Sequence, residues 1–200
     1  YANVHAPHLY EAGFTTCTSY RGVSGAMQVV DIYQAPDWSI FESERFARYR
    51  RVAAADPHLP PFMTGIPNIR TPYVAASPGS DAARQPLATD WITLWRLDAD
   101  ATVTARITDW LAEEGEATLR SRGIGRVRVL KRTRPAPTGT SDRPAVALVL
   151  ESGSRPADEF IDAAGAPDFL RGALGKGPHF CGYRLYPWPD DRGLMAPDAA

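Results

Sequence analysis

The spacing of hydrophobic positions along the chain predicts helices and strands in a regular order. Apolar and aromatic residues recur at helical spacing in the stretches 1–12, 39–55, 102–122 and 157–174. Segments rich in β-branched and aromatic residues, which favour β-strands, lie between and after these stretches. The predicted strands are Phe14–Arg21, Met27–Gln34, Ile66–Ala75, Trp91–Asp98, Ile124–Arg134, Ala145–Leu150 and His179–Tyr186. The second half therefore follows the order β-α-β-β-α-β, and the first half follows the same order without its first strand.

The two halves also correspond in sequence at an offset of 110 positions. Leu9 corresponds to Leu119, and Gly13 corresponds to Gly123, where each glycine is suited to end a helix. We therefore expect an α+β fold in which two ferredoxin-like repeats pack their antiparallel sheets into an α+β barrel. The first strand of the first repeat is expected ahead of Tyr1.

A stretch rich in Pro, Gly, Ser, Asp and Ala divides the chain and predicts a linker over residues 77–89. The first repeat is expected over residues 1–76, without its N-terminal strand, and the second over residues 90–188. Residues 189–200 are expected to form a tail. The predicted organisation is therefore two similar units joined by one connection.

Composition narrows the partners that such a fold could have. The 22 basic and 23 acidic residues nearly cancel, which argues against a whole-protein electrostatic hold on nucleic acid or on an anionic membrane. No apolar run approaches the roughly 18 residues of a membrane span. Only Cys17 and Cys181 are present, so the chain has neither a disulfide framework nor zinc-finger spacing. We therefore expect a cytoplasmic protein that binds neither nucleic acid nor membranes.

Two histidines on the first predicted helix are candidates for catalysis. His5 and His8 stand three residues apart, so both can point to one side of the helix. An imidazole titrates near neutral pH and can move protons at a carbon acid or a carbonyl. The alternative is that one histidine caps a backbone carbonyl and the other is solvated. No nearby Cys, Asp or Glu completes a set of metal ligands, so no metal is expected. The chain has neither a phosphate-binding G-x-x-x-x-G-K-[ST] motif nor a dinucleotide-binding G-x-G-x-x-G motif, and no other cofactor is expected.

Asp31 is the unusual residue of the second predicted strand, because its neighbours suggest a mainly apolar setting. A carboxylate there needs a partner or a raised pKa, and Tyr20 or Arg21 on the hairpin partner could supply the contact. A structural Asp–Arg pair, or an aspartate on a wet face, is the alternative. Tyr20, Tyr33 and Trp38 could line a cavity or could belong to the core.

Basic residues without any acid crowd the segment 120–134. Arg126 and Arg128 alternate there with Val127 and Val129, which predicts a strand with one charged side. We interpret that side as solvated. The alternative is a binding site for an acidic substrate or for an RNA backbone. No aromatic RNA-binding motif lies next to these basic residues.

The start of the chain carries a characteristic order of residues. A helix is followed by Gly-Phe, by a strand ending in Tyr-Arg and by a strand ending in Tyr, at positions Tyr1, His5, Pro7, Leu9, Gly13, Phe14, Tyr20, Arg21 and Tyr33. This order resembles the EthD-like families of the dimeric α+β-barrel superfamily, which often carry W-Y-x-x-x-H-x-P-x-L on that helix. The resemblance implies two four-stranded antiparallel sheets packed face to face, with helices outside. The family histidine falls at Gly115 in the second half, which implies a copy without a site of its own.

The superfamily contains cofactor-free monooxygenases, isomerases, polyketide cyclases and haem-binding enzymes, so the fold alone does not choose the chemistry. We predict a cofactor-independent lyase, isomerase or cyclase that acts on a small, largely apolar carbonyl or aromatic compound. His5 is the expected general acid/base, with His8 and Asp31 as further catalytic residues. The expected substrate-binding residues, in a pocket between the first helix and the hairpin, are Tyr20, Arg21, Tyr33 and Trp38.

Two other functions fit the same sequence. One is a non-catalytic α+β barrel that binds a small ligand or responds to stress, and the other is a cofactor-free monooxygenase. In each case the expected partner is a small molecule. The duplication can close a barrel within one chain, and a homodimer through the outer surfaces is a further expected assembly.

Overall fold

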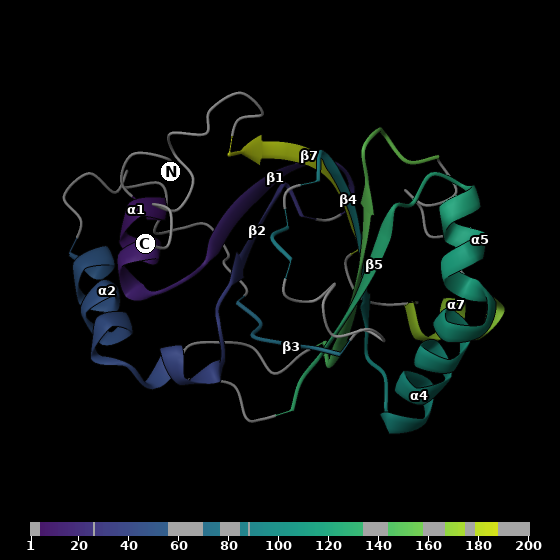
Figure 1. Ribbon diagram of the computed structural model, residues 1–200, viewed down its shortest axis with the longest axis horizontal. Helices are drawn as coiled ribbons and strands as arrows, with labels where there is room; N and C mark the ends of the chain where they lie inside the picture. Colours follow the sequence, from purple (N-terminus) through teal and green to yellow (C-terminus); the bar gives the residue numbers. More distant parts are fainter. Residues whose placement is uncertain are drawn as a thin grey trace.

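One strongly curved sheet stands between two groups of helices in the computed structural model of this chain (Figure 1). The structure describes residues 5–25, 27–55, 70–76, 85–87, 89–133, 144–157, 167–174 and 179–187. The helical elements of the first half are α1 (His5–Ala12), the 3-10 turn η1 (Trp38–Glu42) and α2 (Glu44–Ala54). Those of the second half are α4 (Ala101–Trp110), the π-helical turn η3 (Leu111–Gly115), α5 (Glu116–Ser121) and α7 (Asp168–Leu174).

The described strands form a single antiparallel sheet in the order β2-β1-β7-β4-β6-β5-β3. Their bounds are β1 (Thr16–Gly25), β2 (Val29–Gln34), β3 (Val74–Ala75), β4 (Trp91–Leu97), β5 (Arg126–Lys131), β6 (Val146–Ser152) and β7 (Phe180–Tyr186). The predicted α+β class is therefore confirmed. The strands make one sheet rather than two separate ones, because β1 pairs with β7 and β3 pairs with β5, and strand edges satisfy their backbone groups by pairing.

The order of the described elements agrees with the predicted order in both halves. The helix predicted over 102–122 is interrupted by η3, and the helix predicted over 39–55 is divided into η1 and α2. The second division has a local cause, because Asp37 caps η1 and Ser43 caps α2, each through its side-chain oxygen. Most of the predicted linker, the predicted tail and part of the last predicted helix lie outside the described residues.

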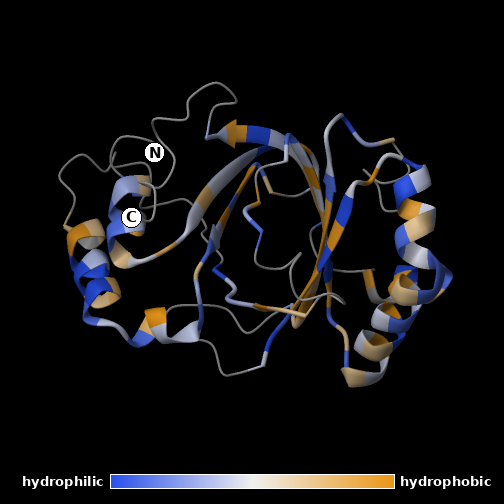
Figure 2. Ribbon diagram, in the orientation of Figure 1, coloured by the Kyte–Doolittle hydropathy of each residue, from blue (hydrophilic) through white to orange (hydrophobic). Residues whose placement is uncertain are grey.

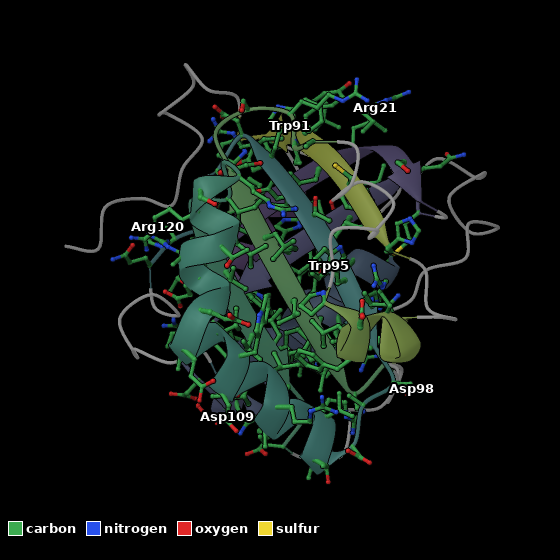
Figure 3. The ribbon with its side chains drawn as sticks, turned by 90° about the vertical axis from the view of Figure 1, so that its right-hand side faces the viewer. Arg21, Trp91, Trp95, Asp98, Asp109 and Arg120 are labelled. Atoms are coloured by element: carbon green, nitrogen blue, oxygen red, sulfur yellow. The ribbon has the colours of Figure 1, made fainter. Side chains whose placement is uncertain are left out.

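Each face of the sheet has its own core, because side chains alternate along a strand. On β4, Trp95 and Leu97 belong to the core under α4, α5 and α7, and Figure 3 shows Trp95 behind these helices. Ile92 and Leu94 belong to the core on the concave face. Figure 2 shows the central strands largely in orange, whereas the helices alternate between orange and blue, as amphipathic helices do.

A buried ion pair lies on the concave face of the second half. Arg128 Nε donates to Glu151 Oε1 at 2.6 Å, and only 4% and 6% of these residues are exposed. Arg128 Nη1 also donates to the Gln85 carbonyl at 2.7 Å. The interpretation of this basic strand as a solvated face is therefore wrong at Arg128, because the curl of the sheet turns that face inward.

Residues 85–87, at the end of the predicted linker, also form hydrogen bonds with the first half. Gln34 Nε2 donates to the same Gln85 carbonyl at 3.1 Å, and Gln34 Oε1 accepts from the Leu87 N–H at 2.6 Å. Thr18 Oγ1 donates to the Leu87 carbonyl at 2.8 Å, and Leu87 is buried. Residues 85–87, called the inner strut below, thus connect the Arg128–Glu151 pair of β5 and β6 to Thr18 on β1 and Gln34 on β2.

Replacing Glu151 by alanine leaves Arg128 buried without its carboxylate partner. The free energy of unfolding is therefore expected to fall by about 3–5 kcal/mol. The matched control is Glu44→Ala, because the Arg51–Glu44 pair is exposed and such pairs contribute about 0–1 kcal/mol. Urea unfolding followed by circular dichroism measures both variants, and equal losses would contradict the importance of the buried pair.

Candidate functional site

Helix α1 holds His5 against the face of β2 that carries Tyr33. Leu9 is buried and fixes α1 on the first-half core. His5 Nε2 lies 3.2 Å from the Tyr33 hydroxyl oxygen, and the ring centroids of His5 and Tyr49 on α2 are 5.9 Å apart. The imidazole is therefore partly buried between α1, β2 and α2.

Burial decides the charge of His5. Desolvation lowers the pKa of His5 from its ordinary value of 6.5, and the Asp31 carboxylate opposes part of this shift. The imidazole is therefore neutral at neutral pH and able to accept a proton. The Tyr33 hydroxyl is within hydrogen-bonding distance of Nε2, so it can share a proton with that nitrogen.

Asp31 lies on the same face of β2 as Tyr33, two residues earlier and about 7 Å along the strand. Its side chain is exposed, so the expectation of an apolar setting is wrong. The physical reason is that β2 is the end strand of the described sheet, and an end strand leaves one side open. In the register, Ser19 stands opposite Asp31, whereas Tyr20 and Arg21 stand opposite other residues.

Tyr20 lies on the opposite face of the sheet from Tyr33. It is fully buried in the concave core, where its hydroxyl donates to the Thr89 carbonyl at 3.1 Å. Burial also raises the pKa of Tyr20. In the register Tyr20 pairs with Val30 and Tyr33 pairs with Cys17, and positions of opposite parity face opposite sides. Contrary to expectation, the two tyrosines therefore do not line one pocket.

The other predicted site residues lie on three different elements, α1, β1 and η1. His8 is partly buried on α1. Arg21 on β1 is exposed, and Figure 3 shows it at the top of the view. Trp38 begins η1, where its ring packs edge to face on the ring of Phe41. Sequence spacing alone did not show which of the predicted site residues contact His5.

Further aromatic rings lie next to the His5–Tyr33 pair. Phe14 meets Tyr33 edge to face, with centroids 5.9 Å apart. Phe46 packs on Tyr49, which in turn meets His5. Phe46 and Tyr49 stand three residues apart on α2, and this helical spacing is the signal in the sequence that could have placed them on one side of the helix.

Cys17 stands opposite Tyr33 in the register and is buried. Burial raises the pKa of the Cys17 thiol to about 12. The thiol is therefore protonated at neutral pH, and a protonated thiol is a poor nucleophile. Cys181 is also buried with a raised pKa, so both cysteines are packing residues.

The second half has a glycine where the first half has His5. A Cβ added to Gly115 would come within 2.7 Å of the Trp110 indole. The Trp110 ring also meets Phe169 edge to face. The space that a side chain at Gly115 would need is therefore already filled by the indole, and this part of the second half is built for packing.

A shallow hollow of about 610 Å³ lies beside the inner strut, away from His5. Its lining includes Gln85, Arg126, Glu151 and Gly153. The predicted pocket lay instead between α1 and the hairpin, where the rings of His5, Tyr33 and Phe14 contact one another. A ligand at His5 would therefore approach from the exposed side of the pair, where Asp31 lies.

No three His, Cys, Asp or Glu side chains gather to hold a metal ion within the described part of the chain. Among the described helices, none is long and apolar enough to cross a membrane. No protein-family model, curated protein or solved structure matches the chain. The EthD-like resemblance therefore stays a prediction.

His5 makes the stability of the fold depend on pH. The ordinary pKa of 6.5 applies to His5 in the unfolded chain, and the pKa is lower in the folded protein. As the pH falls below 6.5, the unfolded chain therefore binds more protons at His5 than the folded protein does. The His5 contribution to the free energy of unfolding is therefore fully present above pH 6.5 and is lost as the pH falls toward the lowered value. Urea unfolding from pH 7 to pH 5 is expected to show a smaller loss for His5→Asn than for the parent protein. His8→Asn is the matched control, and a parent slope retained in His5→Asn would contradict this origin.

Proposed function

We propose that the chain consists of two ferredoxin-like repeats, of which the first carries the functional site. Support for the second repeat is that its strands neighbour one another in the order β7-β4-β6-β5, which is fourth, first, third and second along that half. Support for the first repeat is the element order from α1 to β3, which matches the order from α4 to β7.

We propose further that the first repeat is a cofactor-independent lyase, isomerase or cyclase, with His5 as its general acid/base. The observation that carries this proposal is the His5–Tyr33 contact of 3.2 Å on a partly buried imidazole whose pKa is lowered by desolvation. A neutral imidazole beside a hydroxyl is suited to taking a proton from a carbon acid. The substrate is a small, largely apolar carbonyl or aromatic compound, because Tyr49 and Phe46 adjoin the pair.

The proposed reaction begins when His5 removes a proton from the carbon next to the substrate carbonyl. The electron pair of that C–H bond forms a C=C bond, and the carbonyl π pair moves to oxygen, giving an enolate. The Tyr33 hydroxyl can donate a hydrogen bond to the enolate oxygen. The Asp31 carboxylate raises the pKa of His5 and so favours the imidazolium that forms. His5 then returns the proton to another atom of the substrate, so no oxidant or reductant is consumed.

A non-catalytic ligand-binding role is the second candidate. It is favoured by the close ring contacts of His5, whose centroid lies 6.1 Å from that of Tyr33 and 5.9 Å from that of Tyr49. Such contacts also suit a histidine that only shapes a binding surface. A cytoplasmic location is proposed for either role, because Cys17 and Cys181 are both free thiols.

Removing the imidazole with His5→Ala is expected to lower turnover by about 10²–10⁴-fold, the usual contribution of a general acid/base. The measurement is NMR in D₂O with a panel of small lactones, enones and aromatic ketones, which reports exchange of the carbon-bound proton for deuterium. Thermal unfolding is expected to shift by only a few degrees, because a change of about 1 kcal/mol moves Tm by that amount.

The matched control is Glu116→Ala in the second half, which is expected to leave the exchange rate unchanged. Exchange that survives in His5→Ala at the parent rate would contradict the catalytic assignment. Binding of a panel compound without any exchange in the parent protein would favour the non-catalytic candidate.

A further inference from the structure

The hollow beside the inner strut lies where β5 begins and β6 ends. Gly125 precedes β5 and Gly153 follows β6, and both line the hollow. Its volume of about 610 Å³ lies in the range of small-molecule sites, roughly 300–1,000 Å³. Tyr33, the partner of His5, belongs instead to the core under α1 and α2, on the other face of the sheet. A ligand in the hollow would therefore not reach His5.

The charges around the hollow are unevenly paired. Arg126 on β5 stands directly opposite Glu151 on β6 in the register, a position in which opposite charges stabilise a cross-strand pair. The Glu151 carboxylate nevertheless binds Arg128, two residues further along β5, at 2.6 Å. Among the described residues, no carboxylate pairs with Arg126, whose Nη2 donates to the side-chain oxygen of Gln85. The charge of Arg128 is thus balanced inside the fold, whereas the hollow keeps the positive charge of Arg126.

The contact between Arg126 and Gln85 marks a place for a ligand oxygen. A guanidinium presents its N–H donors in a planar fork that can bind a carboxylate through two parallel hydrogen bonds. The single amide oxygen of Gln85 carries no charge and is a weaker acceptor. The Gln85 side chain is exposed, so it can turn into solvent and leave its position to a ligand. One positive charge in the hollow suits a carboxylate better than a doubly charged phosphate.

Two glycines keep the hollow open without being needed for the backbone. A Cβ added to Gly153 would meet no atom within 4 Å, and one added to Gly125 would come no closer than 3.7 Å to the Glu151 carbonyl oxygen. Neither glycine has a positive φ. A larger side chain at Gly153 would therefore fit the fold and would occupy open space at the hollow.

We propose that this hollow is a second binding site, which takes a small organic acid whose carboxylate binds Arg126 in place of the Gln85 side chain. The apolar body of the ligand lies against Pro86 and the glycine backbone of the lining. The buried Arg128–Glu151 pair holds β5 and β6 together beneath the site. The proposal does not depend on the function proposed for His5, because the two sites lie on opposite faces of the sheet.

Benzoate is a suitable probe, because it joins one carboxylate to a small apolar ring. In a buffer without other carboxylates, it is expected to shift the NMR amide signals of Gly125 and Gly153 and the Nε–H signal of Arg126, and to reach saturation. Benzamide, which is similar in size but uncharged, is expected to bind about tenfold or more weakly, because hydrogen bonds between charged groups are stronger. Phenyl phosphate, with nearly two negative charges, is expected to bind no more tightly than benzoate.

Two pairs of variants test the guanidinium and its partner. Arg126→Gln is expected to weaken benzoate binding about tenfold or more. Arg120→Gln removes the same charge from the exposed end of α5, outside the hollow, and is expected to leave binding unchanged. Gln85→Glu brings a carboxylate of the chain itself to Arg126 and is expected to weaken binding to a similar extent, whereas Gln85→Ala is expected to retain it.

Filling the hollow is a further test. Gly153→Leu is expected to block benzoate binding, and Gly172→Leu on α7 is the matched control, because an added Cβ there also meets no atom within 4 Å. The proposal is overturned if benzoate gives no saturable shifts, if benzamide binds as tightly or if Arg126→Gln binds like the parent protein. Tighter binding of phenyl phosphate would overturn the assignment to a carboxylate. These readouts need no turnover, so their failure is distinguishable from a failure of the His5 exchange assay.

Discussion

The buried Arg128–Glu151 pair is the interaction on which the shape of the described fold depends. Two charges inside a low-dielectric core are tolerated only when each is paired and its remaining hydrogen-bonding groups are satisfied. Here the guanidinium also binds the carbonyl of Gln85, which begins the inner strut across the concave face. The strut in turn binds Gln34 on β2. The ion pair, the inner strut and Gln34 therefore form one connected set of polar contacts between the two halves.

The position of β2 at the end of the sheet gives the candidate site its electrostatic character. His5 is partly buried under α1 and α2, and its imidazole is held neutral by desolvation. Asp31, two residues before Tyr33 on the same face, is exposed. A partly buried imidazole on α1 and an exposed carboxylate on β2 thus belong to one site, and the carboxylate favours the protonated form of the imidazole. An edge strand can produce this contrast, because only one of its sides is covered.

The two helix positions that correspond at the sequence offset of 110 residues carry different side chains. In the first half the position holds His5, whose ring contacts Tyr33 and Tyr49. In the second half it holds Gly115, over which the Trp110 indole lies. A curved sheet needs apolar contact from the helices on both sides, but a reaction needs polar groups on only one side. The proposed function assigns chemistry to the first half and only packing to this part of the second.

The sequence by itself determined the helices, the strands and their order, because side-chain periodicity and helix caps act over a few residues. Strand alternation puts Asp31 and Tyr33 on one face of their strand, and helical spacing puts Phe46 and Tyr49 on one side of their helix. Only the tertiary structure decided that Tyr20 faces away from the site, that Asp31 is exposed and that Arg128 is buried. The burial of a strand face depends on which strands pair and how the sheet curves. Such contacts join residues far apart in the chain, which no local pattern encodes.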